Sequence, residues 1–175
     1  MNFSTNPYAP TSSARTQNTA TTFSSRAFII LCVLGLLLFS GRTHADSLLI
    51  ITNSKSGVTE LSKEQIARIF LGKTRVYPNE TPVVPWILRE KDPTRVRFQI
   101  SVLDRDPMQI KAYWTRLLFT GRGNPPSALE SNTAILHKVI ESPTAIGYIS
   151  TAEVDEAELK RAIKQKQLNI VYRID

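Results

Sequence analysis

An uninterrupted apolar run, residues 27–39 (AFIILCVLGLLLF), most constrains this chain, because it decides which residues can join a globular fold. A polar segment without acidic residues precedes the run, and SGRTHAD follows it. This order is typical of a secretory signal peptide, and Thr43 and Ala45 fit the small-residue positions before a peptidase cut. We therefore expect residues 1–45 to be a cleaved signal peptide and residues 46–175 to be the folded, periplasmic protein.

An uncleaved membrane anchor is the alternative interpretation of the run, although it is shorter than the roughly 20 residues that a membrane-spanning helix needs. Cys32 is the one cysteine of the chain, and it follows Ile30 and Leu31 rather than small residues, so we do not expect lipidation. Once residues 1–45 are removed, no cysteine is left for a disulfide or a thiolate metal site.

Residues 46–175 carry a modest positive charge. The chain has 22 basic and 15 acidic residues, and three basic but no acidic ones precede Asp46, which leaves a net charge of +4. This excess favours anionic partners, but it is not clustered as in nucleic-acid-binding proteins, so nucleic acid is not an expected partner. A segment of this length is one domain that can bury a hydrophobic core.

The pattern of apolar residues predicts a single α/β domain with a mixed sheet flanked by helices, in the order β-α-β-α-α-α-β-α-β. The expected strands are residues 47–52, 83–88, 145–150 and 168–174. Four expected helices begin after the N-caps Ser62, Asp92, Asp106 and Ser131, and a charged helix covers residues 153–165. The Gly- and Pro-rich residues 120–127 predict a turn.

Two strand positions carry finer expectations. Pro85 has no N–H to donate, so it predicts an edge position or a bulge. Gly147 predicts the close approach of another backbone.

Two helices have apolar faces that are expected to point inward. In the helix after Asp92 the face is Val96, Ile100 and Leu103, widened by Phe98 and Val102. In the next helix it is Ile110, Tyr113, Trp114, Leu117 and Leu118, a spacing more typical of a core than of a ligand platform.

Residues suited to catalysis are sparse. His137 is the one histidine after the expected cleavage site, and a solvated or packed histidine is the expectation for it. No second histidine is present to build a metal site, and no G-x-S-x-G, P-loop or G-x-G-x-x-G motif occurs. An enzyme is therefore the weaker hypothesis, and no cofactor is expected.

The segment WILREKDPTRVRF, residues 86–98, has two interpretations. A helix N-terminus offers unpaired N–H groups to an anion, to which Thr94 would add a hydroxyl and Arg89 and Arg95 would add guanidinium donors. Alternatively, Asp92 is a good N-cap, and it would accept the same N–H groups while Pro93 starts the helix. Both interpretations are open from the sequence.

A second candidate for anion binding is the loop after the first strand, with Ser54, Lys55 and Ser56. Ligands of open α/β sheets bind at the carboxyl ends of strands, so this loop and residues 89–95 are expected to face one another. An exposed turn is the alternative.

Three segments resemble small periplasmic proteins that are related to the phosphate-binding subunits of ABC transporters: LSKEQIARIFLGKTRVYPNETPVVPWILRE, YWTRLLFTGRGNPP and SPTAIGYIS. The resemblance covers residues 48–155 and implies the type II periplasmic binding-protein fold, of which this chain has little more than one lobe. It implies non-catalytic binding of phosphate or a related oxyanion. The implied ligand-binding residues are Ser54, Ser56, Arg89, Thr94 and Arg95. An inner-membrane transporter or another envelope protein is the implied protein partner.

The chain departs from this family at the expected phosphate turn. The family's Gly-Ser-Gly-Thr turn falls on residues 92–95, where both glycines are replaced, whereas Arg89 matches the arginine that precedes the turn. A non-catalytic envelope interaction module of the same fold that has lost ligand binding is therefore the alternative expectation.

Overall fold

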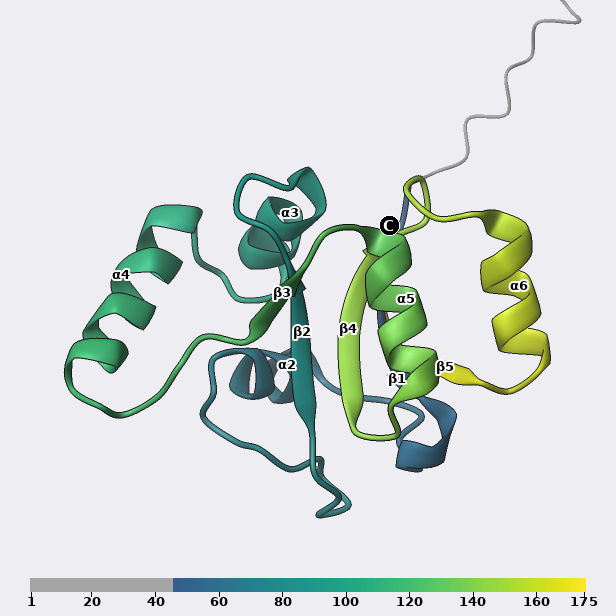
Figure 1. The fold of residues 1–175 in the computed structure, drawn as a ribbon, viewed down its shortest axis with the longest axis horizontal. Helices are drawn as coiled ribbons and strands as arrows, with labels where there is room; N and C mark the ends of the chain where they lie inside the picture. The colour runs from purple at the N-terminus through teal and green to yellow at the C-terminus, as the bar shows by residue number, and fades with distance from the viewer. Residues whose placement is uncertain (1–45) are drawn as a thin grey trace, which may run out of the picture. The chain divides into compact units, whose positions relative to one another are not determined.

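The computed structural model describes residues 46–175 (Figure 1). The expected signal peptide, residues 1–45, lies outside the described residues. The strands are β1 (Leu48–Asn53), β2 (Val84–Leu88), β3 (Ser127–Leu129), β4 (Ala145–Ser150) and β5 (Leu168–Ile174). The helices are the short η1 (Ser54–Ser56), α2 (Lys63–Phe70), α3 (Pro93–Ser101), α4 (Pro107–Phe119), α5 (Asn132–Glu141) and α6 (Glu156–Lys164). Between residues 46 and 175, no helix combines the length and the apolar character that crossing a membrane requires.

The five strands form one mixed sheet in the order β3-β2-β4-β1-β5, which confirms the predicted α/β class. β2 is parallel to both β3 and β4, whereas β1 is antiparallel to both β4 and β5. β1 is therefore antiparallel in direction to the other four strands. As a result, the carboxyl ends of β1 and β2 lie at opposite edges of the sheet (Figure 1).

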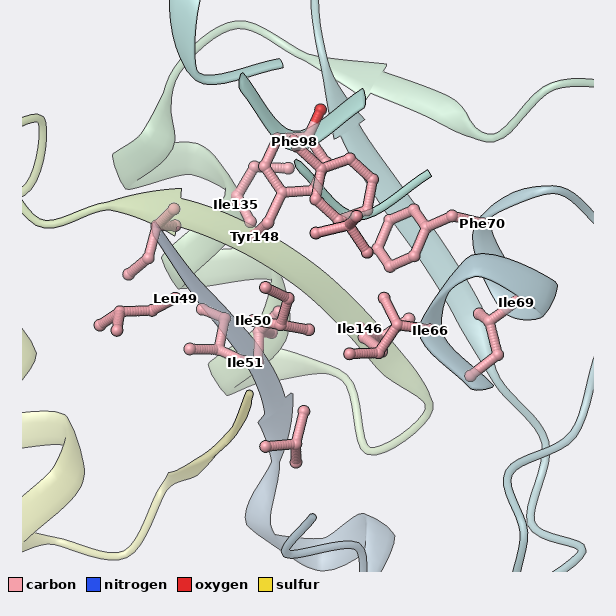
Figure 2. Packing of buried hydrophobic residues seen from close by; sticks show 14 of the residues in the cluster. Leu49, Ile50, Ile51, Ile66, Ile69, Phe70, Phe98, Ile135, Ile146 and Tyr148 are labelled. Carbon is pink, nitrogen blue, oxygen red and sulfur yellow. The ribbon is translucent and has the colours of Figure 1, made fainter. Parts of the chain in front are cut away.

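Helices cover both faces of the sheet. α5 packs on β1 and β4, and α6 lies beside it, because Nε2 of His137 on α5 is 2.6 Å from Oε1 of Glu158 on α6. The opposite face is covered by α2 and α3, whose Phe70 and Phe98 meet Tyr148 of β4 (Figure 2). α4 packs against α3 rather than against the sheet (Figure 1).

An aromatic cluster fixes α3 on the sheet. The rings of Phe98 and Tyr148 are stacked, with their centroids 4.0 Å apart and an angle of 7° between their planes. Phe70 meets Phe98 edge-on at 4.7 Å. The Tyr148 hydroxyl also accepts the backbone N–H of Leu88 at 3.1 Å, so a side chain satisfies the last residue of β2 where its pairing with β4 has ended. These contacts hold the start of α3 at the carboxyl end of β2.

Local capping signals in the sequence are confirmed. Ser62 and Gln65 form a capping box at the start of α2, and Gly72 follows its end with the positive φ of 67° that glycine tolerates best. Asp106 and Ser131 cap α4 and α5 as expected.

The region around β3 and Pro85 differs from the sequence expectations. Residues 127–129 form a short strand where only a turn is expected. The prediction that Pro85 marks an edge position or a bulge is confirmed only locally: β2 lies between β3 and β4 and pairs without a bulge, but β3 does not extend as far as Pro85. The Val84 N–H is directed to β4, where it donates to the Thr144 carbonyl at 2.8 Å. Position 85 is therefore directed to the β3 side, and β3 pairs with β2 only from Trp86 onward, so no donor is missed.

The expected inward face of α3 is partly wrong. Phe98, Val102 and Leu103 are buried, but 55% of Ile100 is exposed. Two further buried residues of α3, Thr94 and Gln99, are polar. Two further sequence expectations also change: Leu118 on α4 is exposed, and the close neighbour of Gly147 is a side chain, that of Ile135, rather than a backbone.

Candidate functional site

A groove of about 510 Å³ lies between α3 and α4. Its lining residues come mainly from these two helices, which pack against one another. Its polar lining residues are Glu90, Lys91, Arg95, Gln99, Lys111 and Thr115. Its apolar lining residues are Val96, Pro107, Met108, Ile110, Trp114, Leu118 and Pro125. The groove therefore combines an apolar wall with a charged end near the start of α3.

Arg95 is the cation that the structure holds most firmly in this groove. Its Nη1 donates to the carbonyl of Leu88 at 2.7 Å, and the residue is half-buried. A guanidinium has five N–H donors, so one bond to a carbonyl leaves most of them for a ligand. The bond to the end of β2 thus orients Arg95 without consuming its capacity to bind an anion.

The backbone N–H groups at the start of α3 are already occupied. Oδ1 of Asp92 accepts the N–H of Thr94 at 2.9 Å and that of Arg95 at 3.4 Å, and the Asp92 carbonyl accepts the N–H of Val96. Pro93 has no N–H. The helix-cap interpretation of residues 86–98 is therefore confirmed, and an anion near this helix would depend on side-chain donors.

Thr94 has a structural role in this arrangement. Its hydroxyl is buried and accepts Nδ2 of Asn132 at 3.4 Å, and Oδ1 of Asn132 accepts the backbone N–H of Ser150 at 2.9 Å. These bonds join α3, α5 and β4. The Thr94 side chain does not line the groove.

Arg89 forms an ion pair with Glu130, and both side chains are largely exposed. Exposed pairs of this kind contribute little to stability, so Arg89 can exchange Glu130 for an anion at low cost.

The serines after β1 lie at the other edge of the sheet. The hydroxyl of Ser54 donates to the Lys166 carbonyl at 2.5 Å, and the hydroxyl of buried Ser56 accepts the N–H of Val58 at 3.3 Å. The expectation that this loop faces residues 89–95 is wrong, because β1 is antiparallel to β4 while β2 is parallel to it. The five residues expected to bind one ligand are thus divided between two edges.

Gln99 is a groove residue that the sequence analysis missed. It is only 5% exposed, it lines the groove, and its side chain makes no hydrogen bond to any of residues 46–175. It was missed because the apolar face of α3 was centred on Ile100. Phe98 and Val102 lie one helical turn apart. Centring the inward face of α3 on these two residues, instead of on Ile100, would have placed Gln99 inward.

The charges around the groove favour an anion. Lys91, Arg95 and Lys111 line it together with one acid, Glu90. A cleft with mainly one sign of charge raises the local concentration of oppositely charged ligands. Across residues 46–175, no cluster of three or more histidine, cysteine or acidic residues is suited to hold a metal ion.

The mixed five-stranded sheet with helices on both faces matches one lobe of the periplasmic binding-protein fold. The chain is similar to a structure described as a phosphate ABC transporter substrate-binding protein with bound phosphate from Clostridium perfringens, with a TM-score of 0.51 and 21% identity. It is also similar to an ABC-type phosphate transport receptor from Vibrio cholerae (TM-score 0.51, 18% identity) and to PstS from Borrelia burgdorferi (TM-score 0.53, 17% identity).

Each of these likenesses covers 72% of this chain but only 44%, 45% and 46% of the three known chains, respectively. The present chain thus spans less than half the length of these solved proteins. Comparison with protein-family models and with curated proteins finds no match. At 17–21% sequence identity, these structural similarities show the fold.

Proposed function

We propose that this protein is an exported, non-catalytic solute-binding protein that binds phosphate or a related oxyanion. The observation that carries the proposal is the set of cations at the start of α3, in a fold shared with proteins described as phosphate receptors. Arg95 is held beside the groove by Leu88, and Arg89 lies at the same edge with only an exposed partner. Guanidinium groups match the geometry of phosphate oxygens.

The proposed route of export is the signal peptide expected in residues 1–45, which would place residues 46–175 in the periplasm. An inner-membrane transporter or another envelope protein is the proposed partner, by analogy with the transport roles described for the similar structures.

Calorimetric titration with inorganic phosphate tests this function. The protein is expressed as the full chain, purified, and freed of carried-over anions before titration with phosphate and sulfate. We expect saturable binding that Arg95→Ala weakens by about tenfold or more, since a hydrogen bond to a charged group contributes about 1.5–3 kcal/mol. Arg161→Ala is the matched control, because Arg161 is an exposed arginine on α6 that does not line the groove.

An envelope interaction module that has lost ligand binding is the second candidate. The Asp92 cap favours it, because this carboxylate takes the backbone donors that an anion would use. This candidate predicts that calorimetry detects no heat of binding with any oxyanion. It also predicts that a protein partner can be cross-linked to this protein in the envelope. Phosphate binding that disappears in Arg95→Ala, with Arg161→Ala unchanged, would reject this candidate.

A further inference from the structure

Gln99 points to a ligand other than an inorganic ion. Gln99 is only 5% exposed, and its side chain makes no hydrogen bond within residues 46–175. Among these residues the one fully buried side-chain polar atom without a partner is Nε1 of Trp86, so the unpaired amide of Gln99 keeps an accessible surface. An accessible amide without a protein partner has its two N–H donors and its acceptor oxygen available to a ligand. Gln99 lines the groove between α3 and α4, so a ligand in the groove can reach its amide.

Arg95 lies one helical turn before Gln99 and lines the same groove. Side chains four residues apart on a helix lie on the same face, so Arg95 and Gln99 can bind the same functional group of a ligand. Arg95 is oriented by its 2.7 Å bond to Leu88 and offers charged donors, while Gln99 offers two more N–H donors and an acceptor. A carboxylate, with two acceptor oxygens, fits this pair.

The rest of the groove is apolar. Ile110 and Trp114 of α4 form its buried floor, at 4% and 8% exposure, and Met108 and Leu118 extend this surface outward. An inorganic phosphate would leave these side chains uncovered. A volume of about 510 Å³ is also large for a single small ion. It lies within the roughly 300–1,000 Å³ typical of pockets for small organic molecules.

The positive charge of the groove determines which organic molecules it can bind. Lys91 and Lys111 line the groove together with Arg95, and within residues 46–175 neither lysine is engaged in an ion pair. Glu90 is the single acid of the lining and leaves an excess of positive charge. This excess favours an anionic ligand over a neutral or cationic one.

We propose that the groove between α3 and α4 binds an organic carboxylate with an apolar body, with its carboxylate between Arg95 and Gln99 and its body along Trp114 and Ile110. This inference goes beyond phosphate binding and does not require it.

Decanoate, 1-decanol and inorganic phosphate are the probes of this proposal. The chain has two tryptophans, Trp86 and Trp114, so in the Trp86→Phe variant the fluorescence reports on the groove alone. We expect decanoate to change the Trp114 emission saturably, with decanol at least about tenfold weaker. Calorimetry on the protein without substitution measures the same binding independently of the Trp86→Phe variant.

Two substitutions of Gln99 separate a binding role from a structural one. Gln99→Leu removes the amide and keeps a side chain of similar size. Gln99→Glu replaces the amide with a carboxylate, which has the same charge as the carboxylate of the ligand. We expect both to weaken decanoate binding by about tenfold or more while the affinity for decanol stays unchanged or rises in Gln99→Leu. Gln165→Leu is the matched control, because Gln165 is an exposed glutamine at the end of α6.

Three results would overturn the proposal. The first is no decanoate binding by fluorescence and calorimetry, and the second is equal binding of decanoate and decanol that Gln99→Glu does not alter. The third is a dimer in sedimentation equilibrium that Met108→Ser dissociates, since a second copy would then cover the groove. Phosphate binding without decanoate binding leaves the proposed function standing and rejects this inference alone, and the opposite result rejects only phosphate binding.

Discussion

A Cβ atom at Gly147 of β4 would lie 2.4 Å from Cγ2 of Ile135 on α5. No real Cβ contact is that short, so α5 lies against the sheet at a distance that only glycine permits at this position. The same helix carries Asn132, whose side chain bonds to Thr94 and to the backbone of Ser150. The fit between Gly147 and Ile135 therefore also positions α3, and with it the candidate site.

Gly147→Ala is expected to lower the free energy of unfolding by about 1–3 kcal/mol, because the added methyl group overpacks the interface between α5 and β4. Urea denaturation at neutral pH measures the change. Ile135→Ala removes Cγ2, so the double variant should lose less stability than the sum of the two single variants. Simple additivity would show that the contact is not what requires glycine.

Asp92→Ala is expected to lower the free energy of unfolding by about 0.5–2 kcal/mol, because it removes an N-cap. It also frees the N–H groups of Thr94 and Arg95 and removes a negative charge beside the cations, so affinity for phosphate should rise. Denaturation and calorimetry on the same variant measure both effects.

Asp155→Ala is the control for this experiment, since Asp155 caps α6 by accepting the N–H of Ala157 at 2.9 Å. It should show a similar loss of stability with no change in phosphate affinity. Equal phosphate affinity in the Asp92 variant and the parent would argue against an anion at the start of α3.

Tyr148→Phe is expected to cost about 1–3 kcal/mol of unfolding free energy, because it leaves the buried N–H of Leu88 without its partner while keeping the ring stack with Phe98. Tyr77→Phe is the comparison. The Tyr77 hydroxyl donates to the carbonyl of Ala145 at 3.2 Å, and a carbonyl that loses one donor is less costly than an orphaned N–H. Equal losses in the two variants would contradict this explanation.

Alkaline pH is expected to destabilise the fold. Burial raises the pKa of both Tyr77 and Tyr148 well above the usual value for tyrosine. Because the unfolded chain would release these protons first, their contribution to stability is complete below the ordinary tyrosine pKa of about 10 and falls as the pH rises above it.

Urea denaturation between neutral pH and pH 11, with tyrosinate absorbance as a second signal, measures this fall. The slope above pH 10 should be smaller in Tyr77→Phe and in Tyr148→Phe than in the parent. An unchanged slope in both variants would assign the loss of stability to other groups.

The local structure of this protein follows from local patterns in its sequence. The caps at Ser62, Asp92, Asp106 and Ser131 are formed as expected, because each one depends on hydrogen bonds between residues two or three positions apart. β4 and β5 have their expected bounds, since buried strands are apolar runs between turn residues. The mixed sheet and the α/β class follow from the order of these elements.

The way in which these elements pack together depends on contacts between distant residues. β3 has three residues with little burial and is defined by its pairing with β2, so its own residues carry no strand pattern. The direction of β1 is set by its ladders with β4 and β5, partners about 100 or more residues away in sequence, and it moves Ser54 and Ser56 to the opposite edge from Arg95. The burial of Gln99 likewise depends on where α4 packs on α3. Such contacts join distant residues, and for that physical reason no local pattern in the sequence specifies them.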